Sequence, residues 1–197
     1  MGIKITIFLM IFTYLFFPCK YYAIEAYAAK TNTFTDKSAL LALKSAINDP
    51  QNLLESSWSS NTSMCQWIGV TCGARHRRVR VLNLSNMSLT GTVPPHIGNL
   101  SFLVTLNFSN NYFHGSLPVE LSRLHRLEKI SMDRNNLTGE IPSWLGSLSE
   151  LQYLYLNDNE FVGPIPISIF NLTSLQVISL YMNKFSGDFF PYFLVIV

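Results

Sequence analysis

Apolar side chains recur along most of the chain with a period of 24 residues. Read from Leu103, the unit is Leu-x-x-Leu-x-Phe-x-x-Asn-x-Phe-x-Gly-x-Leu-Pro, and similar units begin at Leu127 and Leu151. The first apolar positions of each unit alternate with polar ones, which predicts a short β-strand with its apolar side chains in a core. A fixed period of this length predicts a solenoid of stacked coils, since no single unit can bury its apolar face alone.

Other residue types follow the same period at other positions of the unit. They are Asn (Asn111, Asn135, Asn159, Asn183), Gly (Gly91, Gly115, Gly139, Gly163, Gly187), Pro (Pro94, Pro118, Pro142, Pro166) and a further Leu (Leu100, Leu124, Leu148, Leu172). We expect the asparagine to bond backbone groups of its own turn and of the neighbouring coil. Glycine allows a turn conformation or a close backbone approach that a side chain would obstruct, and proline is expected on the outer side, where its missing N–H is not needed.

The repeats are expected over residues 79–187, in about five units. The first unit carries Met87 where later units have Asn, and the fifth runs into an apolar tail at 188–197 that departs from the pattern. An uncapped solenoid end exposes an apolar face and a strand edge. The tail therefore indicates either a truncated array or a short protein with an improvised apolar cap.

The N-terminus is a different kind of segment. Lys4 is followed by an apolar run over residues 5–17 and then by Ala26-Tyr27-Ala28. This order is typical of a secretory signal, predicted over residues 1–28 with cleavage before Ala29. The run is shorter than the roughly 20 apolar residues of a membrane-spanning helix, and an uncleaved anchor is the alternative.

Cleavage at that point removes Cys19 and leaves Cys65 and Cys72. An even pair in an exported chain indicates one disulfide that closes a short loop, with two unpaired buried thiols as the alternative. Zinc needs more ligands than this pair supplies, with only His76 nearby. No metal site and no other cofactor is predicted.

Sequons of the form N-x-S/T agree with export to a secreted or cell-surface location. They occur at Asn61, Asn83, Asn86, Asn99, Asn107, Asn136 and Asn171. The formal net charge of +2 is scattered along the chain and forms no basic stripe for nucleic acid. A small basic cluster at residues 73–78 is expected to be a solvated loop, with contact to an acidic wall polysaccharide as the alternative.

Residues 29–78 are predicted to form an N-terminal cap. Leu40, Leu43 and Ile47 lie at helical spacing before Asp49-Pro50, which ends the helix. Asp36 is expected in a capping box at the positive end of that helix. A large aromatic plate then follows in Trp58 and in the Trp of the predicted disulfide loop.

The loop Cys65-Gln66-Trp67-Ile68-Gly69-Val70-Thr71-Cys72, preceded by the helix and Trp58, resembles the N-terminal cap of plant leucine-rich-repeat receptor kinases and receptor-like proteins. The repeat unit resembles the plant-specific class of leucine-rich repeat. Residues 95–103 resemble the corresponding segment of long-ectodomain receptor kinases that sense microbial peptides. The resemblance implies an α/β solenoid, a right-handed superhelix with a parallel concave β-sheet and a helical, disulfide-bonded N-terminal cap. The family's closing Cys pair and its kinase do not occur in this sequence, which favours a truncated ectodomain.

In such solenoids, residues between the apolar positions of each strand point outward from the concave face. These positions are Val81, Asn83, Ser85, Thr105, Asn107, Ser109, Lys129, Ser131, Asp133, Tyr153, Tyr155, Asn157, Val177, Ser179 and Tyr181. An aromatic patch with neighbouring charges is predicted to contact a peptide or protein, through Lys129, Asp133, Arg134, Tyr153, Tyr155 and Tyr181. Tyrosine also favours strands without any binding role, which is the alternative. Glycans on Asn83 and Asn107 would block approach at the N-terminal end.

The sequence therefore favours a non-catalytic extracellular recognition module. The four histidines occupy unrelated positions of the repeat, and no nucleophile motif or phosphate-binding loop occurs. The resemblance implies an ectodomain in defence or developmental signalling that binds a peptide or protein ligand or a co-receptor ectodomain. A secreted inhibitor of microbial wall-degrading enzymes is the alternative.

Overall fold

The structure is a computed structural model that describes residues 33–186 and 194–196. The predicted signal segment, Cys19, Gly187 and residues 188–193 and 197 of the tail lie outside the described residues. Within the described part, no helix is long and apolar enough to cross a membrane.

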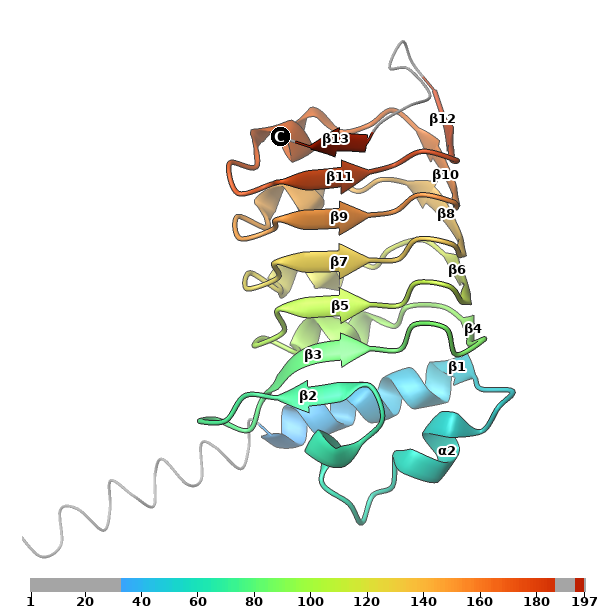
Figure 1. Ribbon diagram of the computed structural model, residues 1–197, viewed down its shortest axis with the longest axis vertical. Coiled ribbons are helices and arrows are strands. Elements are labelled where there is room, and N and C mark those ends of the chain that lie inside the picture. Colours follow the sequence, from blue (N-terminus) through green and yellow to red (C-terminus); the bar gives the residue numbers. More distant parts are fainter. Residues whose placement is uncertain (1–32, 187–193, 197) are drawn as a thin grey trace, which may run out of the picture.

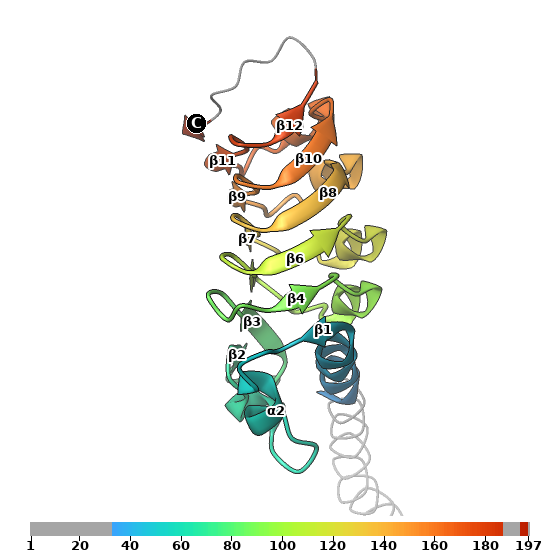
Figure 2. The ribbon, with the colours of Figure 1, turned by 90° about the vertical axis from the view of Figure 1, so that its right-hand side faces the viewer.

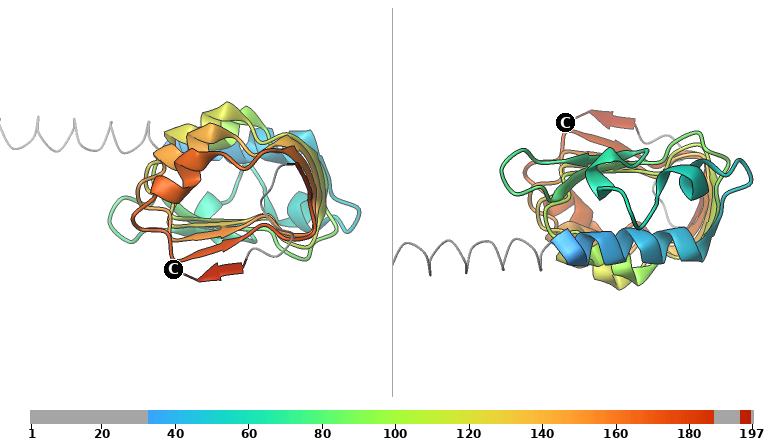
Figure 3. Two further views of the ribbon diagram at one scale, coloured as in Figure 1. Left: turned by 90° about the horizontal axis from the view of Figure 1, so that it is seen from above. Right: turned by 90° about the horizontal axis from the view of Figure 1, so that it is seen from below.

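The described repeats form a stack of similar coils, as the period predicts (Figure 1). Each described coil contributes one strand to a first sheet and one strand to a second sheet, and each of the first four also contributes one 3₁₀ helix. The repeat strands of the first sheet are β3 (Val79–Asn83), β5 (Thr105–Asn107), β7 (Lys129–Ser131), β9 (Tyr153–Tyr155) and β11 (Val177–Ser179). The 3₁₀ helices are η2 (Pro95–Asn99), η3 (Val119–Arg123), η4 (Ser143–Ser147) and η5 (Ile167–Asn171). They lie on the side of the stack opposite the first sheet (Figure 3).

The register of the first sheet advances by one period from strand to strand. Leu82 pairs with Leu106, Leu106 with Ile130, Ile130 with Leu154 and Leu154 with Ile178. All of these side chains are buried in a core that runs the length of the stack. Parallel pairing of equivalent residues therefore turns the sequence period into one continuous apolar column.

A second sheet, which the sequence pattern does not predict, lines another side of the coils (Figure 2). Its repeat strands are β4 (Thr90–Gly91), β6 (Tyr112–Gly115), β8 (Asn136–Glu140), β10 (Glu160–Gly163) and β12 (Lys184–Phe185). These strands are short, polar and rich in glycine, so they lack the apolar alternation by which strands are recognised. The glycines at 91, 115, 139 and 163 have positive φ, a backbone conformation that glycine adopts readily, but they lie within these strands and not in a separate turn.

The repeat asparagines form a buried ladder between coils. Asn135 donates to the carbonyl oxygens of Phe108 in the preceding coil (3.0 Å) and Met132 in its own coil (3.1 Å). Its Oδ1 accepts a bond from the backbone N–H of Phe113 at 2.9 Å. Asn111, Asn159 and Asn183 make equivalent bonds. The predicted role of these residues is confirmed, and each links two coils through otherwise unpaired backbone groups.

The N-terminal cap covers the first edge of both sheets. A helix over residues 33–46 leads into β1 (Ile47–Asn48), which pairs antiparallel with β4. After α2 (Leu53–Ser57) and η1 (Met64–Gln66), β2 (Val70–Cys72) pairs antiparallel with β3. At the other end, β13 (Leu194–Ile196) pairs antiparallel with β11. These strands give hydrogen-bond partners to edges that the parallel repeats alone would leave open.

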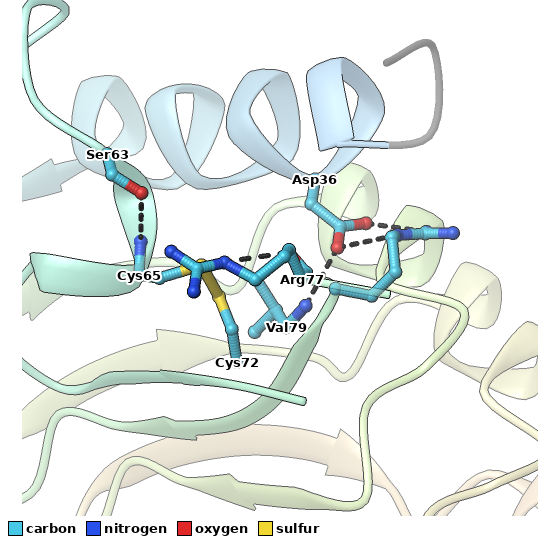
Figure 4. The surroundings of a disulfide bond; sticks show 7 residues. Asp36, Ser63, Cys65, Cys72, Arg77 and Val79 are labelled. Carbon is cyan, nitrogen blue, oxygen red and sulfur yellow. Dashed lines mark hydrogen bonds and ion pairs between the residues drawn. A yellow bond between two sulfur atoms is a disulfide. The ribbon is translucent and has the colours of Figure 1, made fainter. Parts of the chain in front are cut away.

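The disulfide loop carries the aromatic plate predicted for the cap. Cys65 and Cys72 are joined, with their Cα atoms 5.4 Å apart (Figure 4). Trp58 and Trp67 are buried and stacked, with ring centroids 5.3 Å apart. Their indole N–H groups donate to the carbonyl of Ile68 and to the hydroxyl of Thr62, respectively. Both large rings are therefore buried with their polar atoms paired.

The structure departs from the expectations for the cap at two residues. The carboxylate of Asp36, expected in a capping box, is fully buried and faces the first repeat, where it accepts bonds from Arg78 and from the backbone N–H of Val79 (Figure 4). Arg78 was expected in a solvated loop, yet only 5% of its surface is exposed. A buried carboxylate requires a charged and hydrogen-bonded partner, which explains both departures.

Candidate functional site

The outward face of the first sheet brings the centre of the predicted aromatic patch together. Lys129 on β7 pairs in register with Tyr153 on β9, and Tyr155 follows two residues later on the same face. The Nζ of Lys129 lies 5.4 Å from the centroid of the Tyr155 ring. This distance allows a cation–π interaction that orders the two side chains at the surface.

Tyr153 is held from the opposite direction. Its hydroxyl hydrogen-bonds with Oε1 of Gln176, in the loop that leads into β11, at 2.8 Å. Tyr153 and Tyr155 are half-buried, so each ring has one part packed on the sheet and another part open to a partner. Anchored tyrosines lose little conformational freedom on binding, which is a property of protein-contact surfaces.

Asp133 lies at the edge of this patch and is also half-buried. Burial raises the pKa of its carboxyl, and the charge of Asp158 acts in the same direction. Its own backbone N–H and the charges of Arg134 and Lys129 oppose the rise. The patch therefore presents a carboxylate that gains from a positively charged or hydrogen-bond-donating partner.

Not all of the predicted residues join the centre of the patch. Arg134 is exposed, and its Nη1 donates to Oδ1 of Asn110 at 3.4 Å, along the rim of the preceding coil. Tyr181 is 37% exposed and follows β11 in the last described coil. We name Lys129, Asp133, Tyr153, Tyr155 and Tyr181 the tyrosine patch, with Arg134 at its rim.

Three small residues predicted to point outward are in fact buried. Ser131 and Ser179 pair in register on either side of Tyr155, and a serine reaches less far from the sheet than the tyrosine beside it. Ser179 donates to Oδ1 of Asn157, and Asn157 donates to the carboxylate of Asp158. These residues form a polar floor beneath the aromatic rings.

The sequons lie at the surface. Asn107 is half-buried and the other Asn side chains of the set are exposed. In Asn83 and Asn107, Oδ1 accepts bonds from the N–H and hydroxyl of the serine two residues later. Both lie on the outward face of the first sheet, on β3 and β5, and their glycosylation stays a prediction.

A second group of residues was not singled out from the sequence. Arg78, Phe102, Arg126 and Glu150 occupy the same position of four consecutive coils, 24 residues apart, beside a cleft at the margin of the first sheet. These four residues follow the repeat period. In the sequence, however, only the cluster at residues 73–78, in the turn between β2 and β3, is recognisable by its charge. Comparing equivalent positions across coils is the signal that would have found the others.

The described residues include no group of three or more His, Cys, Asp or Glu side chains that could hold a metal ion. The tyrosine patch offers aromatic surface, one ammonium group and one carboxylate. Such groups support non-covalent recognition of a polypeptide.

Comparison with family models agrees with this architecture. A model described as a leucine rich repeat N-terminal domain matches residues 35–73. A model described as a leucine-rich repeat region matches residues 59–190, which is more than half of the chain.

Two relatives are plant receptor kinases. A putative receptor-like protein kinase of Arabidopsis thaliana is 46% identical over 86 residues, 44% of this chain and 8% of that protein. The LRR receptor-like serine/threonine-protein kinase EFR of the same plant is 46% identical over 92 residues, 46% of this chain and 9% of that protein. The chain thus spans less than a tenth of the length of these relatives.

Solved structures give the same result. The BIR2 ectodomain of Arabidopsis thaliana superposes with a TM-score of 0.73 and 34% identity, covering 77% of this chain and 82% of that chain. A chain from the Arabidopsis receptor kinase HAESA in complex with the peptide hormone IDA and the co-receptor SERK1 gives a TM-score of 0.59 at 29% identity, over 77% of this chain and 30% of that one. With a repeat model over more than half of its length, a matched N-terminal domain and these neighbours, the chain belongs to the leucine-rich-repeat family in the form found in plant receptor-kinase ectodomains.

Proposed function

We propose that this chain is an extracellular recognition module that binds a peptide or the ectodomain of a partner receptor through the tyrosine patch. The observation that carries the proposal is the ordered contact of Lys129 with Tyr155 beside Tyr153 on the first sheet. The proposal assigns no chemistry to the chain itself. A kinase, such as its relatives are named for, would belong to a longer protein.

The matched HAESA structure, in which a peptide hormone and a co-receptor are both present, supports this kind of partner. The alternative of a secreted enzyme inhibitor gains no support from the relatives reported above. Aromatic residues that are held in place before binding concentrate interface energy, so the two β9 tyrosines are expected to be the main anchors.

The experiment is a surface-plasmon-resonance titration of the purified, secreted protein against the SERK1 ectodomain and a panel of plant peptide hormones. We compare the wild type with a Tyr153→Ala/Tyr155→Ala double variant and with Tyr112→Ala. Tyr112 is the matched control, because it is a 58% exposed tyrosine on β6 of the second sheet.

For a partner that binds the wild type, the Tyr153→Ala/Tyr155→Ala double variant is expected to weaken the affinity at least about a hundredfold, because both anchoring rings are lost. Tyr112→Ala is expected to leave the affinity unchanged. A partner whose affinity falls with Tyr112→Ala and not with the double variant would place the interface on the second sheet. That result would overturn the assignment to the tyrosine patch.

A further inference from the structure

A cleft of about 520 Å³ opens at the margin of the first sheet, where the chain enters β5 and β7. The turn between β2 and β3, over residues 73–78, forms one wall. The loops that lead into β5 and β7 form the other, with Phe102 and Arg126. Lining residues that carry or can carry positive charge come from both walls, so the cleft is basic where they meet.

Phe102 lies between two guanidinium groups at the base of this cleft. The Cζ of Arg78 is 4.7 Å from the centroid of the Phe102 ring, and that of Arg126 is 4.1 Å away. His76 approaches the same ring, with centroids 5.9 Å apart. Stacking on an aromatic ring fixes the plane of a guanidinium and leaves its N–H groups free to bind along its edge.

The charge of Arg78 is already compensated, whereas three others are not. Arg78 forms a buried ion pair with Asp36. Across the described residues, no ion pair or hydrogen bond joins the side chains of Arg75, Arg80 or Arg126 to another group. These three guanidinium groups line one cleft and are open to solvent.

The side chain of Arg80 is positioned by Gly73, at the start of the turn between β2 and β3. Its aliphatic stem lies over Gly73, where a Cβ atom would come within 3.2 Å of Arg80 Cδ. A stem packed on backbone reduces the rotamer freedom that an arginine otherwise loses on binding. The basic side of the cleft is therefore partly organised before any partner arrives.

The cleft also has an acidic side. Glu128 and Glu150 line it where the chain approaches β7 and β9. A uniform polyanion that filled the whole cleft would meet both carboxylates, while a chain of mixed charge would place its acidic part on the hairpin side alone. This polarity favours a peptide segment over an acidic polysaccharide.

We propose that this cleft binds the acidic side chain of an extended peptide, with a carboxylate held by Arg75, Arg80 and Arg126 beside the stack of Arg126 on Phe102. The inference rests on the proposed function, because it adds a charge preference to the peptides that the chain would recognise. A peptide reaching from the cleft would cross the first sheet toward Lys129 and the tyrosine patch.

The test titrates ¹⁵N-labelled full-length secreted protein with acetyl-Glu-Glu-Ala-Ala-Lys-amide and follows the arginine Nε–Hε signals by NMR. The matched probe is acetyl-Gln-Gln-Ala-Ala-Lys-amide, and tetragalacturonate is the polysaccharide probe. The variants are Arg80→Gln and Arg126→Gln. Arg123→Gln is their control, because Arg123 is exposed on η3 and does not line the cleft.

The acidic peptide is expected to shift the Arg80 and Arg126 signals of the wild type. Arg80→Gln and Arg126→Gln are each expected to weaken the affinity for this peptide about tenfold, the effect of one charge-assisted contact. The glutamine peptide and Arg123→Gln should have no comparable effect. Equal binding of both peptides, or an equal loss in Arg123→Gln, would overturn the proposal. Tighter binding of tetragalacturonate than of the acidic peptide would overturn the assignment to a peptide.

Thermal unfolding of each variant shows whether it remains folded, and Arg126→Lys provides a second, charge-conserving change. Tighter binding of the acidic peptide by Arg126→Lys than by Arg126→Gln would support the charge as the cause of the loss. The SERK1 and peptide-hormone titration is repeated with Arg80→Gln. If the cleft binds no acidic peptide while partner binding still depends on Tyr153 and Tyr155, the cleft proposal fails and the proposed function stands.

Discussion

Arg78 and Asp36, 42 residues apart in the sequence, form a buried two-point ion pair between the first repeat and the helix of the cap. Arg78 Nε and Nη2 donate to the two carboxylate oxygens at 2.8 and 2.7 Å. The backbone N–H of Val79 adds a third bond, at 2.9 Å. The pair fixes the cap to the start of β3 at one point.

Replacing Arg78 by Ala is expected to destabilise the protein by about 3–5 kcal/mol, because it leaves the Asp36 carboxylate buried without its charged partner. Urea unfolding followed by tryptophan fluorescence measures the change, since Trp58 and Trp67 lie in the same cap. Arg123→Ala, an exposed arginine on η3, is the control and should stay within about 0.5 kcal/mol of the wild type. Equal stability of the two variants would show that Arg78 does not hold the cap.

Asn135 is expected to be as important as a core apolar residue. Its side chain satisfies backbone groups of two adjacent coils, including the carbonyl of Phe108 and the N–H of Phe113. Asn135→Ala leaves these groups buried and unpaired, which should lower the free energy of unfolding by at least about 2 kcal/mol. The matched control is Asn136→Ala at the exposed neighbouring position, both measured in protein freed of glycans. A loss that is no larger in Asn135→Ala would contradict the ladder.

Most of the core could be predicted from the sequence because each of its columns repeats. Leu106, Ile130 and Leu154 lie at equivalent positions, and the structure pairs them in adjacent strands. The loop between Cys65 and Cys72 was similarly recognisable, since the two cysteines lie only seven residues apart. Local spacing and a fixed period carry this information without knowledge of the folded chain.

Contacts between different parts of the repeat could not be predicted in the same way. The pairing of Asp36 with Arg78 depends on where the cap helix docks, which no spacing in the sequence sets. The stack of Arg78, Phe102 and Arg126 depends on how far adjacent coils lie apart. For the tyrosine patch, the alternation of residues in each strand predicts which side chains share a face. It does not predict how deeply each side chain is buried, because that depends on the size of its neighbours: Ser131 is buried beside the larger Tyr155.

One position of the coil has a left-handed backbone in every described repeat. It is occupied by Asn86, Asn110, Arg134, Asp158 and Met182, with φ between 53 and 59°. Asn and Asp tolerate this region, whereas an unbranched apolar residue such as Met182 gains no local hydrogen bond there. Met182 is also 70% exposed, so its side chain contributes little burial.

Met182→Asn is therefore expected to stabilise the protein by about 0.5–1 kcal/mol. Thermal unfolding is the measurement, with Met182→Ala as the control that keeps the backbone penalty and removes the side chain. Met182→Gly should also stabilise if backbone strain is the cause. A gain in Met182→Ala as large as that in Met182→Asn would point to the exposed thioether, and not to the left-handed backbone, as the source.

Asp133 gives the tyrosine patch a predicted pH dependence. Burial, the largest cause, raises the pKa of its carboxyl above the value it has in the unfolded chain, and Asp158 adds to the rise against Arg134 and Lys129. Between the two pKa values the folded state binds more protons than the unfolded state. Stability contributed by Asp133 is therefore full below the unfolded pKa and is lost as the pH rises through the folded one.

Asp133→Asn removes the titrating carboxyl group and with it this contribution to the pH dependence of stability. The melting temperature of the variant relative to the wild type should rise as the pH increases from about 3 to about 7, the range in which carboxyl groups titrate. Asp158→Asn is the matched variant, because removal of that charge should lower the pKa of Asp133 in the folded protein. The pH range over which the stability contributed by Asp133 is lost should then become narrower. The Asp133 carboxyl can be followed directly by ¹³C NMR. A titration midpoint at or below that of aspartate in an unfolded peptide would contradict burial as the dominant influence, because the lysine, the arginine and the backbone hydrogen bond would then outweigh it.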